Sequence, residues 1–221
     1  MTSYGRVTEM CRSQMLWDNF EAVLVQRAPE LLSTWFAPAS LDEIEDAEAE
    51  LNLKFPRDLW LAYLRHNGSS GDPQLPGLFV GHIAEWLSLS DMKAYWRTAR
   101  EISLEAWPDN CDSPADAEMN QGKVRRDVWN RGRIPVGRVH ANDHFFIDLL
   151  PGASGTVGQL VRDPDMWGDC TDESVVATSF DAYLTLFADR LEQGLIAYVP
   201  GQAWVNQHGK TFSNWLNLSG W

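Results

Sequence analysis

The sequence predicts an α+β fold, in which a mainly antiparallel sheet of about four to six strands packs among N-terminal helices and a C-terminal helix. Two patterns lead to this prediction. Apolar residues repeat at helical spacing through the first third of the chain and again after residue 180. Between residues 134 and 161, short runs of β-branched and aromatic residues alternate with turn residues, which is typical of consecutive hairpins.

Three helices are expected in the first third of the chain. Residues 14–28 place apolar side chains on one helical face. Ser40 and Glu43 have the spacing of a capping box, so a second helix should begin there and run to residue 51. Residues 59–64 outline a third helix, which the pair Asn67-Gly68 can close through a left-handed cap.

The middle of the chain alternates between regular and irregular segments. A short strand is expected within residues 74–83, and apolar residues from Met92 to Ile102 then predict a fourth helix. Residues 108–122 are polar and aperiodic, so they are expected to form a long exposed loop.

The second half of the chain is expected to build the sheet. Its strands are predicted over residues 134–139, 145–150, 156–161 and 174–178. Asp148 lies in an otherwise apolar strand, so its carboxylate is expected to bond neighbouring backbone groups, with contact to a partner as the alternative. An amphipathic helix over residues 180–191 follows and ends before Gly194.

The chain length favours one domain with additions at both ends. It has 221 residues, of which 44% are hydrophobic, and it contains 11 tryptophans. We expect a helical N-terminal extension at 1–34, a main domain at 35–194 and a Trp-rich tail at 195–221. The tail holds one charged side chain, Lys210, and is expected to pack on the domain.

Charge and cysteine content narrow the functional classes. The formal net charge is −13, which disfavours binding to nucleic acid or to an anionic membrane and favours a basic protein partner. The alternative is that the acidity only aids solubility. The three cysteines lack any paired spacing and indicate free thiols in a reducing cytoplasm. No signal peptide and no membrane-spanning segment is expected.

No motif predicts catalysis, a cofactor or a metal. His140 and His144 could ligate a metal only if a tight hairpin brought them together, and in such a turn the two imidazoles are expected to diverge. Gly209-Lys210-Thr211 is similar to the end of a phosphate-binding loop, but that loop's first glycine is replaced by Trp204. We therefore expect an ordinary turn there.

Acidic residues gather in three segments, at 42–50, 105–118 and 163–173, which hold six, five and five carboxylates and no basic residue. In the first of them, Asp42 and Asp46 as well as Asp46 and Glu50 are like-charge pairs one helical turn apart, and nothing nearby in the sequence compensates them. This helix face could be merely solvated or could meet a partner.

A series of short motifs, in a fixed order, resembles one known family. The motifs are Pro38-Ala39-Ser40 before Ile44 and Glu48, Phe55-Pro56 before Trp60 and Tyr63, His66-Asn67-Gly68, Trp129, Ile134-Pro135-Val136, Asn142-Asp143, Phe146-Ile147-Asp148-Leu149, Pro151-Gly152, Gly155, Gly158-Gln159-Leu160-Val161, and a last helix with Phe180, Tyr183 and Leu184. Over about residues 35–191 the chain resembles the SUKH superfamily. That group includes fungal Smi/Knr cell-wall regulators and bacterial immunity proteins encoded beside toxins.

The resemblance implies a cytoplasmic protein without enzymatic activity that binds other proteins. The first expectation is an immunity protein that occludes the active site of a cognate, basic toxin. The alternative is a regulator or scaffold of cell-wall synthesis, and an unrecognised enzyme is the third possibility.

One acidic segment is the candidate partner-binding surface. It places Trp167 and Met166 among carboxylates, a composition suited to an apolar anchor surrounded by charges that orient a basic partner. The alternative is that Trp167 covers the end of the sheet. The candidate contact residues are Asp163, Asp165, Met166, Trp167, Asp169, Asp172 and Glu173.

Overall fold

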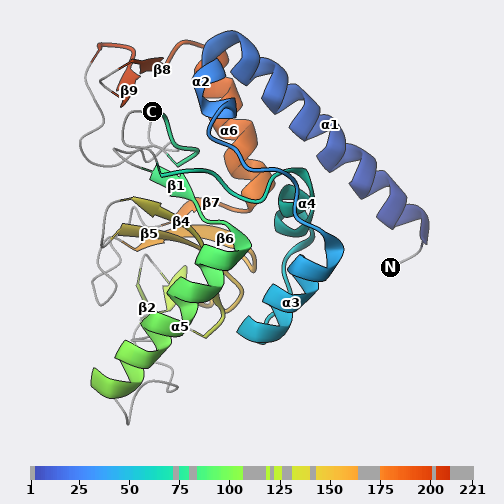
Figure 1. The fold of residues 1–221 in the computed structure, drawn as a ribbon, viewed down its shortest axis with the longest axis vertical. Helices are drawn as coiled ribbons and strands as arrows, with labels where there is room; N and C mark the ends of the chain where they lie inside the picture. Colours follow the sequence, from blue (N-terminus) through green and yellow to red (C-terminus); the bar gives the residue numbers. More distant parts are fainter. Residues whose placement is uncertain are drawn as a thin grey trace.

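The computed structural model describes residues 3–71, 75–79, 84–106, 118–119, 122–125, 131–139, 143–163, 175–200 and 203–209. Its helices are α1 (Ser3–Arg27), α2 (Pro29–Leu32), α3 (Leu41–Leu51), α4 (Arg57–Arg65), α5 (Leu89–Ala106) and α6 (Phe180–Glu192). Its strands are β1 (Ala84–Trp86), β2 (Glu118–Met119), β3 (Val124–Arg125), β4 (Arg133–Val139), β5 (Asp143–Asp148), β6 (Gln159–Asp163), β7 (Val175–Ala177), β8 (Ile196–Val199) and β9 (Ala203–Asn206). Figure 1 shows their arrangement.

A five-stranded antiparallel sheet in the order β1-β4-β5-β6-β7 forms the centre of the molecule. The pairs β2-β3 and β8-β9 form two small hairpins. Two successive hairpins, β4-β5 and β5-β6, supply the middle of the sheet, as the runs of β-branched and aromatic residues predict. The α+β fold class and the antiparallel sheet are therefore confirmed.

Alternation along the strands gives the sheet two different faces. Ile134, Ile147 and Leu160 are neighbours in register and belong to the main hydrophobic core. That core also contains Tyr183 and Phe187 from α6. On the other face, the ring of His144 lies 4.3 Å from that of Tyr95 in α5. The sheet is thus enclosed between α6 and α5.

Most of the predicted elements appear where the sequence places them. The capping box of α3 is present, because Ser40 Oγ accepts from Glu43 N while the Glu43 carboxylate accepts from Ser40 N. Pro29 does not only end a helix; it occupies the first turn of the short α2, where its missing N–H costs nothing. Within residues 74–83, where a short strand is expected, the structure describes residues 75–79, and these are irregular; the nearby strand is Ala84–Trp86.

The predicted left-handed closure of α4 is also wrong. The helix ends at His66 with an extended backbone, φ −149° and ψ 137°. The positive φ of +86° falls two residues later, at Gly68. There the chain passes so close to the start of α5 that an added Cβ would lie 2.6 Å from Ser88 N. Glycine is needed for this close approach rather than for ending the helix.

The C-terminal segment packs on the domain as far as it is described. Trp204 in β9 is 1% exposed, and its Nε1 donates to Gly77 O at 3.0 Å. Its ring meets Phe187 of α6 edge-on, with centroids 5.1 Å apart. Trp215 and Trp221 lie outside the described residues.

Candidate functional site

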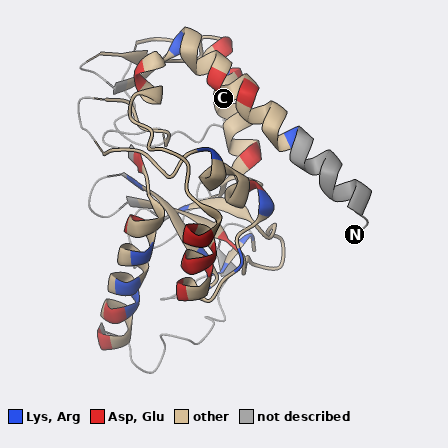
Figure 2. Ribbon diagram, turned by 45° about the vertical axis from the view of Figure 1, so that its right-hand side comes forward, with Lys and Arg blue, Asp and Glu red and all other residues tan. Residues whose placement is uncertain are grey.

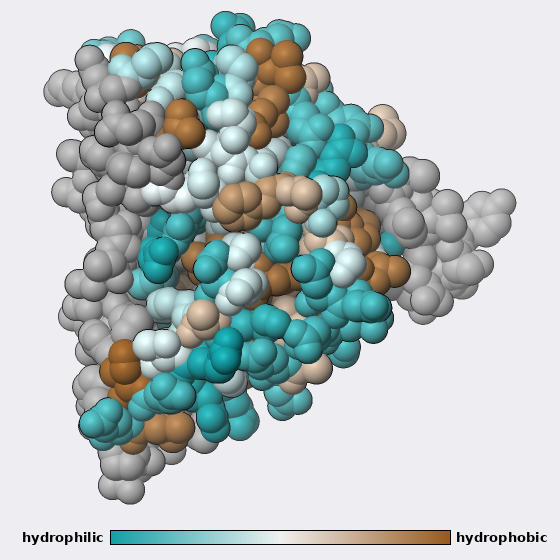
Figure 3. Space-filling view, viewed as in Figure 1, coloured by the Kyte–Doolittle hydropathy of each residue, from teal (hydrophilic) through white to brown (hydrophobic). Residues whose placement is uncertain are grey.

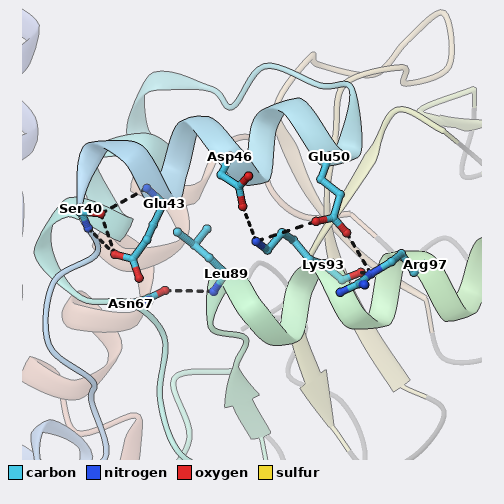
Figure 4. A network of polar contacts seen from close by, with 8 residues as sticks. All are labelled: Ser40, Glu43, Asp46, Glu50, Asn67, Leu89, Lys93 and Arg97. Atoms are coloured by element: carbon cyan, nitrogen blue, oxygen red, sulfur yellow. Dashed lines mark hydrogen bonds and ion pairs between the residues drawn. The ribbon is translucent and has the colours of Figure 1, made fainter.

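The acidic helix α3 is paired with basic side chains of α5. Lys93 Nζ lies 2.6 Å from Asp46 Oδ2, and Arg97 Nε lies 2.9 Å from Glu50 Oε1. Figure 4 shows both pairs across the contact between α3 and α5, and Figure 2 shows the two helices side by side. The like-charge pairs in α3 are therefore compensated, contrary to expectation, by residues 47 positions away.

A second network holds α1 against α4. Both oxygens of Glu21 accept from Arg65, each at 2.7 Å, and His66 Nε2 lies 2.9 Å from Glu21 Oε1. Burial alone would raise the pKa of Glu21, but the hydrogen bonds of Arg65 and His66 outweigh it and lower the pKa. This network joins α1 to the end of α4, while α1 packs mainly along α6 (Figure 1).

A hollow of about 480 Å³ opens between α1, α4 and α6. We call it the polar hollow. Its lining includes Arg12, Ser13, Arg57, Asp58, Asp181 and Thr185. The sequence does not single out any of these residues as part of a site, because they come from three separate segments that only the fold brings together.

Asp58 joins two sides of the polar hollow. Its Oδ1 accepts from Leu59 N in α4 at 2.9 Å. Its Oδ2 accepts from the first two amides of α6, Phe180 N at 2.9 Å and Asp181 N at 3.2 Å. Ser179 caps the next amide of the same helix, Ala182 N. Asp58 therefore has a structural role, and both of its oxygens are already engaged.

The carboxylate of Asp181 has fewer hydrogen-bond partners than that of Asp58. Its Oδ2 accepts from Ser13 Oγ at 2.8 Å, whereas its Oδ1 is buried and has no hydrogen-bond partner. Burial and the nearby charge of Asp58 raise the pKa of Asp181, although Ser13 and Arg12 oppose them. A carboxylate held in a hollow against a desolvation cost is a common property of functional sites.

The polar hollow also has unused donors. Neither Arg12 nor Arg57 makes an ion pair or a side-chain hydrogen bond in the part of the chain that is described, and Arg57 Nε is buried. Arg12 is exposed, and its charge offsets that of Asp181. Among the described lining residues, one buried donor, Arg57 Nε, and one buried acceptor, Asp181 Oδ1, therefore have no hydrogen-bond partner.

A second hollow, of about 270 Å³, lies between α1 and α4 and shares Ser13 with the first. We call it the Trp17 hollow, because Trp17 lines it together with Leu61, Leu64 and the polar residues Ser13, Gln14 and Arg65. Trp17 is 2% exposed, yet its Nε1 has no hydrogen-bond partner. A buried donor without an acceptor costs about 1–3 kcal/mol.

Replacing Asp181 by Asn should raise the thermal stability at neutral pH. The raised pKa means that ionised Asp181 destabilises the folded state above its folded pKa, and that this penalty is relieved as the pH falls. Asn can still accept from Ser13. The gain, followed by thermal unfolding, should shrink from neutral to mildly acidic pH. Asp189→Asn, on the exposed side of the same helix, is the control. A pH-independent gain would contradict this explanation.

The partner-binding residues predicted from the sequence mostly lie outside the described residues. Residues 164–173 include Asp165, Met166, Trp167, Asp169, Asp172 and Glu173, and only the backbone of Asp163 is placed, at the end of β6. Their role in partner binding therefore stays a prediction. His140, Lys210 and Thr211 also lie outside the described residues, so the expectation that they form neither a metal site nor a phosphate site stays a prediction.

Other residues singled out in the sequence have structural surroundings. Asp148 is fully buried, and its Oδ1 accepts from Leu150 N at 3.0 Å while its Oδ2 accepts from Gln159 Nε2 at 3.2 Å. The backbone-bonding role expected for it is confirmed. Within the described ranges, no three His, Cys, Asp or Glu side chains are grouped as a metal site would require.

The surface in view is mostly hydrophilic, with apolar residues in small separate groups (Figure 3). Among the helices that the structure describes, none combines the length and the apolar character needed to cross a bilayer.

Comparison with known proteins gives consistent matches. The chain is 26% identical over 164 residues to the cell wall biosynthesis/cell cycle regulator smi1 of Schizosaccharomyces pombe, which covers 71% of this chain and 31% of that protein. It is 22% identical over 215 residues to the cell wall assembly regulator SMI1 of Saccharomyces cerevisiae. This match covers 81% of this chain and 40% of that protein. It is 20% identical over 208 residues to the glucan synthesis regulatory protein of Neurospora crassa. This match covers 80% of this chain and 38% of that protein.

The chain thus spans 31% to 40% of the length of these relatives. A family model, described as SMI1 / KNR4 family (SUKH-1), matches residues 38–186. The match includes α3 to α5, the first half of α6 and the whole five-stranded sheet, whereas α1 and α2 precede it. Because this match extends over most of the chain, the protein belongs to the SMI1/KNR4 (SUKH-1) family.

Proposed function

We propose that this chain is a regulatory protein-binding module that acts on cell-wall synthesis by holding a partner protein, without chemistry of its own. The observation that carries the proposal is the family match over residues 38–186, together with relatives named as regulators of cell-wall assembly and glucan synthesis. The two hollows support it, because depressions lined by both apolar and charged side chains suit the recognition of another polypeptide.

A second candidate, an immunity protein that occludes the active site of a basic toxin, is favoured by the charge. The chain carries 31 acidic and 18 basic residues. Its field would attract a basic partner and speed association, an effect that salt weakens. Asp46 and Glu50 of α3 already form ion pairs with Lys93 and Arg97 of α5. Other acidic residues would therefore have to contact the basic toxin.

Capture of the partner tests the proposal. The immobilised chain, exposed to an extract of the cells that produce it, should retain a wall-synthesis protein stoichiometrically. The released partner should have an unchanged mass by intact mass spectrometry and an unchanged activity, because binding forms no covalent bond. Recovery of a toxin that regains activity after separation would favour the second candidate. A partner that returns chemically modified would contradict both and indicate an enzyme.

A further inference from the structure

Helix α1 contacts the rest of the fold in the way that a ligand helix contacts a groove. Its buried side chains Trp17, Phe20 and Leu24 are three and four residues apart, so they lie on one helical face. Anchors at this spacing are typical of an amphipathic helix bound in an apolar groove. Val25 is exposed on the outer side of α1, which runs along the outside of the molecule (Figure 1).

The surface beneath these anchors is aromatic. The ring of Trp17 stacks on that of Trp86, with centroids 6.0 Å apart, and meets that of Trp35 edge-on at 5.9 Å. The ring of Phe20 lies 5.9 Å from that of Phe187 in α6. Buried aromatic contacts of this kind contribute much of the binding energy of protein interfaces. The surface is therefore suited to hold a helix that carries aromatic anchors.

Charged side chains form the rim of this surface. Arg65 donates to both oxygens of Glu21, and its second contact is Asp18 Oδ1 at 2.8 Å. His66 also bonds Glu21. The rim thus favours a helix with acidic residues beside its apolar anchors, and an apolar centre with a polar rim is typical of protein interfaces. We call this surface the α1 groove, and it comprises Trp35, Arg65, His66, Trp86 and Phe187.

Most of the α1 groove belongs to the family domain, whereas its occupant does not. Arg65, His66 and Trp86 lie within residues 38–186, the segment that the family model matches. Helix α1 ends at Arg27, before that segment begins. The family domain therefore contributes to an aromatic groove that the matched segment does not fill, and in this chain the preceding helix covers it.

Helix α1 fits this groove incompletely. The polar hollow and the Trp17 hollow, of about 480 and 270 Å³, remain along its contacts with α4 and α6. Trp17 Nε1 is buried without an acceptor, and an anchor that lacks this donor would avoid the cost of leaving it unpaired. The groove thus leaves room for a helix that fits it better than α1 does.

We propose that the α1 groove is the surface on which this chain holds its partner, and that the partner supplies an amphipathic helix with aromatic anchors and neighbouring acidic residues, which replaces α1. This inference rests on the proposed binding function and assigns it a surface. Helix α1 is then an autoinhibitory contact, because it has to leave the groove before the partner helix enters.

A peptide copy of α1 is the probe that tests this proposal. Residues 12–28, with an N-terminal fluorophore and an amidated C-terminus, are titrated with the full chain and followed by fluorescence anisotropy. In the unchanged chain, α1 competes from an effective concentration of about millimolar. Phe20→Ala weakens the contact of α1 and raises the fraction of molecules with an open groove. It should therefore bind the peptide at least about tenfold more tightly than the unchanged chain.

Val25→Ala is the matched control, because this exposed side chain makes no anchor contact, and it should bind the peptide as the unchanged chain does. If Phe20→Ala does not fold, Glu21→Gln takes its place. It keeps all the anchors and weakens only the bonds to Arg65 and His66, so peptide binding should tighten by at least about twofold.

Paired changes locate the peptide in the groove. With the Phe20→Ala chain, a peptide that carries Glu21→Gln should bind at least about threefold more weakly than the unchanged peptide, because it loses its charged bonds to Arg65. Adding Arg65→Gln to that chain should remove the difference between the two peptides, since the two positions interact directly. The Glu21→Gln chain serves for the same comparison.

The proposal is overturned if no chain binds the peptide, if the loosened chain binds it no better than the unchanged chain, or if the two peptides still differ after Arg65→Gln. Partner capture separates this failure from that of the proposed function. Saturating peptide should release the partner from the loosened chain. A partner that stays bound at full strength would sink the α1 groove as its binding surface and leave the function standing.

Discussion

Gly68→Ala should destabilise the protein by at least about 3 kcal/mol, one of the largest effects expected for a single methyl group. The φ of +86° is unfavourable for alanine. The added Cβ would also lie 2.6 Å from Ser88 N, 2.7 Å from Trp86 O and 2.8 Å from Leu87 C. These are backbone atoms at the junction of β1 and α5, so they cannot move aside as a flexible side chain can. Denaturant unfolding measures the loss.

Gly194→Ala is the matched control for this change. Gly194 has a φ of +68°, yet nothing lies within 4 Å of the position of an added Cβ. It should lose about 1 kcal/mol from backbone strain alone. The difference between the two variants measures the cost of the close approach. Equal losses would show that Gly68 is needed only for its φ.

Phe20→Ala should cost about 3–5 kcal/mol, because it removes a large side chain from the core. Phe20 is 1% exposed, and its ring lies 5.9 Å from Trp17, 6.1 Å from Trp35 and 5.9 Å from Phe187 of α6. It comes from α1, which precedes the part matched by the family model. A loss of this size would show that α1 stabilises the family domain.

Val25→Ala, in the same helix but 60% exposed, should change the stability by less than about 0.5 kcal/mol. Unfolding of Phe20→Ala should stay a single transition, monitored by tryptophan fluorescence and circular dichroism together. Two separate transitions, or a loss as small as that of Val25→Ala, would mean that α1 is an independent extension, as the boundary expected at residue 34 supposes.

The elements that could be predicted are those fixed by neighbouring residues. The capping box at Ser40 and Glu43 depends on a spacing of three residues, so the sequence reveals it directly. The paired runs that form β4, β5 and β6 are likewise adjacent in the chain. Local hydrogen bonding and hydrophobic periodicity determine both.

The interactions that escaped prediction join distant segments. The charges of α3 look uncompensated until Lys93 and Arg97 are brought beside them by α5. Asp58 is an ordinary first-turn acid in the sequence, and its bond to Phe180 crosses 122 positions. The two hollows depend on three helices whose relative placement no local pattern encodes. Unused donors such as Trp17 Nε1 can be recognised only once the surrounding acceptors are known.

The double engagement of Asp58 has a consequence for how the molecule opens. One carboxylate accepts from the first turn of α4 and from the first two amides of α6. If either helix start frays, the hydrogen bonds between Asp58 and the first amides of α6 are lost. The two helix starts therefore form a single cooperative unit of local unfolding. Any change that orders the start of α4 would therefore also order the start of α6, so the effect would extend from residue 58 to residue 180.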